Sequence, residues 1–138
     1  MKTEKVSVNL SPTELGLIDL LVERGMFDNR SDFMRASARK TLEGYENSVD
    51  EFLHPSFLFD ESKITLVCAL GVAELTQSHI SHCIYHNKKI HIRAIGLLKV
   101  ADGITPQDIL ATVDSCKIHG KIAASQEVKA ILLDMQNK

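Results

Sequence analysis

Apolar and polar side chains alternate along residues 5–10, KVSVNL. Val6, Val8 and Leu10 occupy every second position, and polar residues occupy the positions between them. Because successive side chains of a strand point to opposite faces, the pattern predicts a short strand with one apolar and one polar face. The next strand-like run begins only near Ile64. The strand is therefore expected to pair with a distant part of the chain or with the same stretch of a second copy.

A helix is predicted to begin directly after this strand. Ser11 stands at the N-cap, Pro12 at the first helical position and Glu14 three residues after the cap, which is the spacing of a capping box. Gly25 is expected to end the helix. Apolar residues recur at helical spacing and form a broad face, which comprises Leu15, Leu17, Ile18, Leu21 and Val22.

A second helix is predicted from the stretch DNRSDF, with Ser31 as its N-cap. The residues expected to face inward are Phe33, Met34, Ala38 and Leu42. A strand and two helices within residues 1–45 cannot close a hydrophobic core alone, because units this small need disulfides, a metal or oligomerisation. Oligomerisation is the option that this composition leaves. The strand is therefore expected to pair antiparallel with its twin in a second subunit, over a shared four-helix core.

Four features follow one another in residues 3–43: polar alternation, a capped helix, a glycine-containing turn and a second helix that opens with NRSDFMR. Together they resemble a ribbon-helix-helix DNA-binding module of the CopG-like kind. In such modules a two-stranded ribbon enters the major groove of double-stranded DNA. The resemblance implies that Lys5, Ser7 and Asn9 read base edges. It also implies that backbone amides at Arg30 and Ser31 hold a phosphate at the N-terminus of the second helix.

Acidic residues mark a boundary after this module. The stretch from Glu46 to Ser62 contains five acids and no Lys or Arg, and Pro55 lies in its middle. We interpret residues 46–61 as an acidic linker between a DNA-binding domain, residues 1–45, and a C-terminal α/β domain, residues 62–138, that assembles or senses.

Asp28 and Asp32 place acids near the expected phosphate, which departs from the pattern of the family.

Three glycines recur at nearly regular spacing in the C-terminal part. The segments LVCALGVAEL, HIRAIGLLKV and CKIHGKIAAS place Gly71, Gly96 and Gly120 at spacings of 25 and 24 residues. A helix-like segment follows each, so the order is β-α-β-α-β-α, which requires parallel strands. The fold class is thus α+β or α/β, with three stacked strand-helix repeats after the ribbon-helix-helix module. The residues expected to be buried include Leu66, Ile95, Leu97, Ile118 and Ile122.

A ferredoxin-like βαββαβ domain is the alternative for this part of the chain. Nickel-responsive regulators join such a domain to a ribbon-helix-helix module, and HISHCIYH offers His79, His82 and His86 on one helical stripe for Ni²⁺ or Zn²⁺. However, the same helix would turn Cys83 into the core, and the His-x-His strand with a downstream cysteine of those regulators is absent. We therefore expect no metal or other cofactor, and keep these three histidines as weaker candidates.

Composition limits the remaining classes of function. The chain has 138 residues, 44% of them hydrophobic, and a net charge of −2. No apolar run reaches the roughly 18 residues of a membrane span, and the N-terminus lacks the apolar centre of a signal peptide, so a cytoplasmic protein is expected. Three widely spaced cysteines indicate buried thiols. No motif of a catalytic or phosphate-binding site occurs, so we do not expect an enzyme.

The sequence therefore predicts a homodimeric or larger regulator of transcription that binds double-stranded DNA. Two alternatives stay open. The ribbon could serve dimerisation alone, in a homo-oligomeric assembly module, or the chain could be a metal-responsive regulator.

Overall fold

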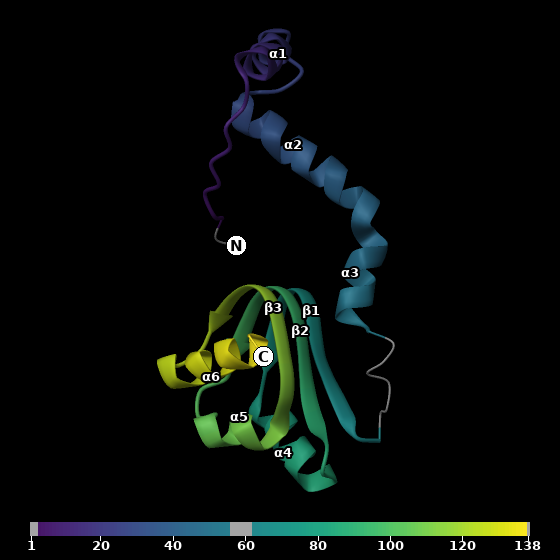
Figure 1. Ribbon diagram of the computed structural model, residues 1–138, viewed down its shortest axis with the longest axis vertical. Coiled ribbons are helices and arrows are strands. Elements are labelled where there is room, and N and C mark those ends of the chain that lie inside the picture. Colours follow the sequence, from purple (N-terminus) through teal and green to yellow (C-terminus); the bar gives the residue numbers. More distant parts are fainter. Residues whose placement is uncertain (1–2, 56–61, 138) are drawn as a thin grey trace. The chain divides into compact units, whose positions relative to one another are not determined.

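The computed structural model describes residues 3–55 and 62–137. The chain forms two compact units, residues 1–46 and 47–138, whose elements are coloured along the sequence in Figure 1. Among the described residues no helix is long and apolar enough to cross a membrane. Each unit is described separately below.

The first unit contains two helices joined by a tight turn. Helix α1 spans Pro12–Glu23, and its capping box is formed as predicted: the Ser11 hydroxyl accepts from the Glu14 amide, and the Glu14 carboxylate accepts from the Ser11 amide, both at 3.2 Å. The helix ends where predicted, because Gly25 has a φ of +78°, a conformation that glycine adopts at little cost. Helix α2 spans Arg30–Leu42 and continues into a short 3₁₀ turn, Glu43–Tyr45.

The cap of α2 differs from the prediction. Asn29, not Ser31, is the N-cap residue, and its side-chain oxygen accepts from the Asp32 amide at 2.8 Å. Asp32 also accepts from the Asp28 amide at 3.2 Å. An Asn side chain offers the same acceptor as Ser, and here the helix begins two residues earlier than the hydroxyl would require. Ser31 is consequently the second residue of the helix.

The segment predicted as an acidic linker contains a helix. Helix α3 spans Glu46–Leu53. Leu53 is buried, and the ring of Phe52 lies 4.9 Å from the ring of His119. Spaced apolar residues within the acidic run, which the charge pattern obscured, explain why it folds. The rest of the predicted linker, residues 56–61, lies outside the described residues.

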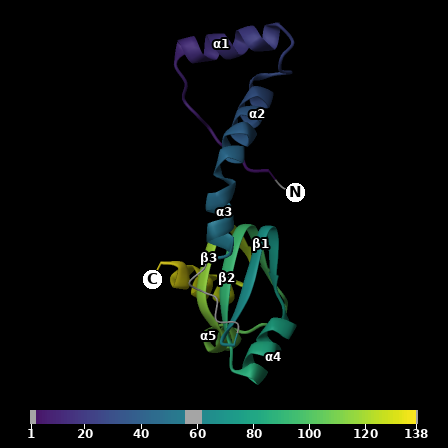
Figure 2. The same ribbon diagram turned by 90° about the vertical axis from the view of Figure 1, so that its right-hand side faces the viewer.

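The second unit is built on a parallel three-stranded sheet in the order β1-β2-β3 (Figures 1 and 2). The strands are Ile64–Leu75, Lys89–Val100 and Val113–Ala123. Helices follow each strand in turn: α4 at Gln77–His86, α5 at Pro106–Thr112 and α6 at Gln126–Gln136. Right-handed connections between neighbouring parallel strands carry successive helices to the same face. Buried residues of all three helices accordingly share one core with the sheet.

The ferredoxin-like alternative is wrong for this unit. A βαββαβ order would break residues 90–102 into a hairpin, but Lys89–Val100 is one uninterrupted strand with parallel partners on both sides. Helix α5 then begins after a five-residue connection. Its start is fixed by a capping box between Thr105 and Asp108.

The sheet buries a different set of residues from the one predicted. Ile118 and Ile122 are buried as expected, whereas Leu66, Ile95 and Leu97 are half-buried on the opposite face. A one-residue error in assigning the inward parity moves a whole strand to the other face. The face that meets the helices carries Val67, Ala73, Leu75, Ile90, Ile92, Ala94 and Leu98 from β1 and β2.

The three glycines of the sequence pattern lie side by side in the sheet. Gly71 pairs with Gly96 on β2, and Gly96 pairs with Gly120 on β3, which is the register that their spacing predicts. All three have positive φ, between +108° and +142°. A side chain at Gly96 would overlap the carbonyl of Gly71. The row is therefore a close approach of three backbones, which leaves no room for a Cβ on β2 or β3.

Candidate nucleic-acid interface

The single chain exposes residues 5–9 of the predicted ribbon, whereas Leu10 is half-buried. Residues 3–10 form no strand pairing with any described part of the chain. Lys5, Ser7 and Asn9 are exposed. Val6 and Val8 are also exposed, at 81% and 58%. Apolar side chains this exposed in a regular alternation are typical of an interaction surface.

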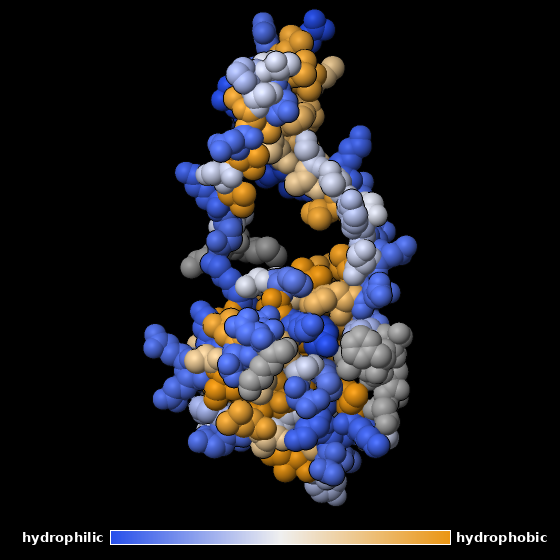
Figure 3. Space-filling model, in the orientation of Figure 1, coloured by the Kyte–Doolittle hydropathy of each residue, from blue (hydrophilic) through white to orange (hydrophobic). Residues whose placement is uncertain are grey.

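An apolar groove adjoins this segment on α1 and α2. Its volume is about 350 Å³, and the surface view shows hydrophobic side chains gathered on these helices (Figure 3). Within described residues 3–46, Ile18 is the one buried hydrophobic residue. The unit therefore lacks a closed core of its own, as predicted from its size. The groove is lined by Leu10, Glu14, Leu17, Ile18, Leu21, Phe33, Met34 and Ser37.

The helix α2 places the predicted phosphate contacts at its N-terminus. Arg30 and Ser31 are its first two residues, whose amides have no acceptor within the helix. The helix dipole favours an anion at this end. The Asp32 carboxylate opposes the binding of a phosphate there, because the two negative charges repel each other. This carboxylate also accepts from the Asp28 amide in the same turn. The rings of Phe27 and Phe33 pack edge to face at 5.1 Å and hold the turn that precedes the helix.

The Arg30 side chain is engaged within the unit. Its Nε and Nη2 atoms each donate to the Asp19 carboxylate at 2.8 Å, which joins α1 to α2. Hydrogen bonding to Arg30 lowers the pKa of Asp19, and the same contact raises the pKa of Arg30. This bidentate pair was not foreseen from the sequence, because the two residues are eleven positions apart and belong to different helices. The guanidinium orients the second helix, while the backbone amide of Arg30 stays at the helix end.

Comparison with known protein families identifies the family of this chain. A model of the ribbon-helix-helix transcriptional regulator family matches residues 1–129. The chain belongs to the ribbon-helix-helix transcriptional regulator family. The match extends far beyond the N-terminal module and includes all three strands of the sheet. No curated protein and no solved structure matches the chain.

Family membership indicates a DNA-binding regulator of transcription, a class that is generally non-enzymatic. It gives no role to individual residues. Lys5, Ser7, Asn9, Arg30 and Ser31 therefore remain predicted contacts of this ribbon-helix-helix protein.

One histidine of α4 takes part in the helix cap, and the other two contact each other. The Thr76 amide donates to His79 Nδ1 at 3.0 Å, and the Thr76 hydroxyl accepts from the His79 amide, which completes a capping box. The rings of His82 and His86 contact each other at a tilt of 47°, with their centroids 4.4 Å apart. Among the residues that the structure describes, no group of three His, Cys, Asp or Glu side chains could hold a metal ion.

The cysteines are ordinary thiols of the second unit. Cys83 and Cys116 are buried as predicted, whereas Cys68 is half-buried, with its sulfur 3.9 Å from His54 Nδ1. Burial raises the pKa of Cys116 to about 12 and also raises the pKa of Cys68. A protonated thiol is a poor nucleophile and a poor metal ligand.

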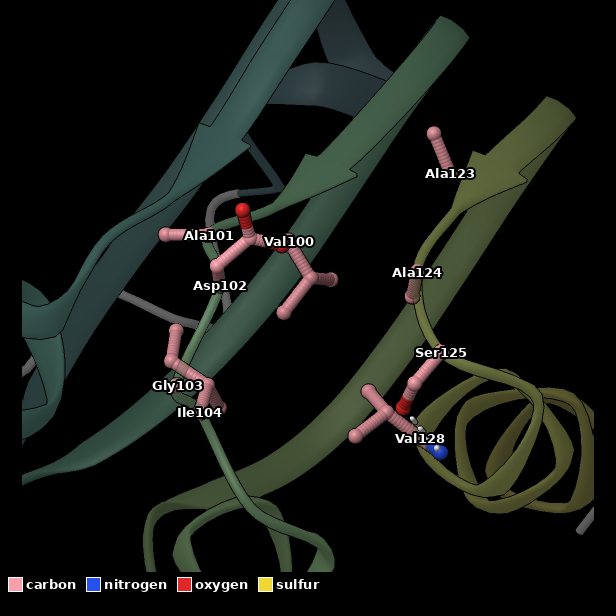
Figure 4. Close-up of a pocket in the computed structure, with 9 residues that line it drawn as sticks. All are labelled: Val100, Ala101, Asp102, Gly103, Ile104, Ala123, Ala124, Ser125 and Val128. Carbon is pink, nitrogen blue, oxygen red and sulfur yellow. Dashed lines mark hydrogen bonds between the residues drawn. The ribbon is translucent and has the colours of Figure 1, made fainter.

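A cavity of about 360 Å³ opens at the carboxyl ends of β2 and β3 (Figure 4). Such an edge is where parallel α/β sheets bind ligands. Its walls are mostly small or apolar, and its charged residue, Asp102, is exposed. The Ser125 hydroxyl caps α6 by accepting from the Val128 amide at 3.3 Å. The cavity thus has the position of a ligand site without convergent buried polar groups.

A polar network on β2 and β3 was missed entirely by the sequence reasoning. His91 Nδ1 and Ser115 Oγ are 2.6 Å apart, and Arg93 Nη1 donates to the same hydroxyl oxygen at 3.2 Å. His91 Nε2 faces Asp114 Oδ2 at 3.4 Å. Burial lowers the pKa of His91, against an opposing effect of Asp114. The one available signal was the polar residues at alternate positions in the hydrophobic strand HIRAIGLL.

Proposed function

We propose that this protein is a sequence-specific regulator of transcription whose residues 5–10 form an antiparallel two-stranded ribbon with a second copy. The ribbon enters the major groove of double-stranded DNA. The observation that carries the proposal is the exposed apolar stripe of Val6 and Val8 beside an apolar groove, in a chain of this family. Water-exposed stripes of this kind are stabilised when two subunits bury them together.

The polar face of the same segment supports direct reading of bases. Pairing through Val6, Val8 and Leu10 turns Lys5, Ser7 and Asn9 of both chains to the outer side, because strand side chains alternate. A β-ribbon fits the major groove, where each base pair offers a distinct pattern of donors and acceptors. Asn9 can contact both N6 and N7 of an adenine, and Lys5 can contact a guanine or a phosphate.

The N-terminus of α2 supports a phosphate contact that fixes the ribbon in the groove. We assign this contact to the amides of Arg30 and Ser31. The ion pair between Arg30 and Asp19 holds α2 against α1, so that the amides are positioned before DNA binds. Phosphate contacts orient a protein on DNA but carry little sequence information, so specificity rests on the ribbon.

We further propose that the second unit consists of three copies of one strand-helix unit stacked side by side. The aligned glycines and the repeated capping of the helices by Thr76, Thr105 and Ser125 support this interpretation. Each copy covers part of its neighbour, so the last one is needed to close the core. The unit then serves assembly or sensing in the regulator.

A gel shift with fragments of the protein's own promoter tests the proposal. We expect a shift at modest salt that survives an excess of random DNA, because base contacts add to the phosphate contacts. In the rival role the ribbon only dimerises an assembly module. The protein would then form an oligomer but would show no preference for promoter DNA over random DNA. A Leu17→Asp variant, which places a charge in the apolar groove, should lose the shift; a Leu110→Asp variant, equally exposed but on α5, should keep it.

A further inference from the structure

Arg93 is a buried cation that forms no ion pair with the residues that the structure describes. It lies on the central strand β2 and is 6% exposed. Its Nη1 donates to the Ile92 carbonyl at 3.0 Å and to Ser115 Oγ at 3.2 Å, and both acceptors are neutral. Among the described residues no carboxylate contacts the guanidinium. Burying a guanidinium without an anion is costly, so an Arg in this position calls for a negatively charged partner.

The neighbours of Arg93 add positive charge and hydrogen-bond donors. Register pairs Arg93 with Cys68 on β1 and Lys117 on β3, and it pairs His91 with Ser115. Because strands in register present paired residues on the same face, these side chains gather on the face of the sheet away from the helix-covered core. The carboxylate of Asp114 faces His91, and the Asp114 side chain is 62% exposed.

The end of α3 extends over the same face of the second unit. His54 lies beside Cys68, the register partner of Arg93, and Phe52 packs on His119 of β3. Contacts with both outer strands bring residues 52–54 across the central strand at this level. A site shielded from water in this way strengthens the attraction between a guanidinium and an anion.

We propose that Arg93, Ser115 and Lys117 bind a small oxyanion, a phosphate or a carboxylate, on this face of the sheet. The planar fork of Arg93 suits two oxygens of such a group, the Ser115 hydroxyl can donate to a third, and Lys117 adds charge at the rim. A DNA backbone is excluded as the ligand because it could not reach a side chain that is 6% exposed. The site does not depend on the ribbon, so this inference stands apart from the proposed function.

The test is binding of inorganic phosphate and of succinate to the full chain without DNA, by calorimetry and by thermal unfolding at constant ionic strength. We expect saturable binding of at least one probe and a rise in Tm of a few degrees that saturates with it. Arg93→Gln should weaken binding at least tenfold, because it removes the charge and keeps an amide donor. Lys129→Gln, which removes an exposed charge on α6, should leave the affinity unchanged.

The comparison of phosphate with succinate separates a phosphate ligand from a carboxylate ligand. No saturable binding of either probe to the wild-type chain would overturn the proposal, as would unchanged affinity in Arg93→Gln. If Arg93→Gln does not fold, Ser115→Ala and Lys117→Gln decide. A loss of threefold or more in either variant supports the site, and unchanged affinity in both refutes it. The gel shift with promoter DNA tests the proposed function independently of these binding measurements. Either proposal can therefore be refuted while the other stands.

Discussion

Gly120 lies beside Gly96 across β3 and β2, so close that a methyl group on Gly120 would overlap the carbonyl oxygen of Gly96. The same relationship holds between Gly96 and Gly71. At Gly71, on the edge strand, nothing lies within 4 Å of the position that a Cβ would occupy. The row therefore contains two positions where a side chain is sterically excluded and one where only the backbone conformation opposes it.

This difference predicts graded effects of alanine. Gly120→Ala should lower the free energy of unfolding by about 3 kcal/mol or more, because a clash with backbone adds to an unfavourable positive φ. Gly71→Ala should cost about 1 to 3 kcal/mol from the backbone conformation alone. Urea denaturation of the two variants and the wild type measures both. Equal losses would mean that the close approach of the strands contributes nothing.

The sequence predicted the positions of elements better than the faces that they bury. The capping box at Ser11, the helix end at Gly25 and the register of the glycines follow from local rules about hydrogen bonds and backbone conformation. Which side chains of the sheet are buried depends on whether the odd- or the even-numbered residues of each strand face the helices. In strands that are apolar on both faces, the sequence pattern does not distinguish the two. Leu66 was misplaced for that reason.

The candidate site was predictable to the same limited extent. The ribbon positions follow from alternation and from the family pattern. Contacts between residues distant in sequence do not, so the pair of Asp19 with Arg30 and the network around Arg93 became visible only in three dimensions. The cap of α2 was misassigned because Asn29 and Ser31 are both good N-cap residues, and only the helix start distinguishes them.

Asn9→Ala should weaken binding to the cognate operator by about 1 to 3 kcal/mol and leave binding to random DNA nearly unchanged. The reason is that an amide in the ribbon is expected to contact a base edge, which random sequences do not match. Fluorescence anisotropy with both DNAs gives the two affinities. An equal loss on operator and random DNA would show that Asn9 does not read a base.

Lys5→Ala distinguishes a base contact from a phosphate contact. If Lys5 neutralises a phosphate, the slope of log K against log salt should fall by about 0.9 for each lysine, or about 1.8 for a dimer. Affinity for operator and random DNA should then fall together. A loss confined to the operator, with an unchanged slope, would instead assign Lys5 to a guanine. Lys129→Gln is the matched control, since it removes a lysine from the exposed side of α6.

Leu17→Asp should dissociate the ribbon-helix-helix dimer. Leu17 is 58% exposed in the single chain and lines the apolar groove, so a second copy would bury the new carboxylate at high cost. Hydrodynamic measurements across a range of concentrations should show a weaker association than in the wild type. Leu110→Asp changes a residue on α5 that is 63% exposed and lies outside the groove. Association that survives Leu17→Asp, together with DNA binding, would place the dimer interface elsewhere.

His91 should make the second unit less stable as the pH falls below neutrality. Protonation would place a second positive charge beside the Arg93 guanidinium, on a histidine that is largely buried. Burial lowers the pKa of His91 below its ordinary value of 6.5. Between these two pKa values the unfolded chain binds a proton that the folded chain does not, so acid favours unfolding.

The loss of stability should begin as the pH falls through about 6.5, the pKa of a histidine in the unfolded chain, and should end below the lower folded pKa. Urea midpoints at several pH values between 7.5 and 5 follow it. His91→Asn, which keeps a polar group beside Ser115 and cannot titrate, should flatten this part of the profile. His82→Asn, on the exposed side of α4, should leave the profile unchanged. A His91→Asn profile as steep as that of the wild type would mean that other groups cause the acid sensitivity.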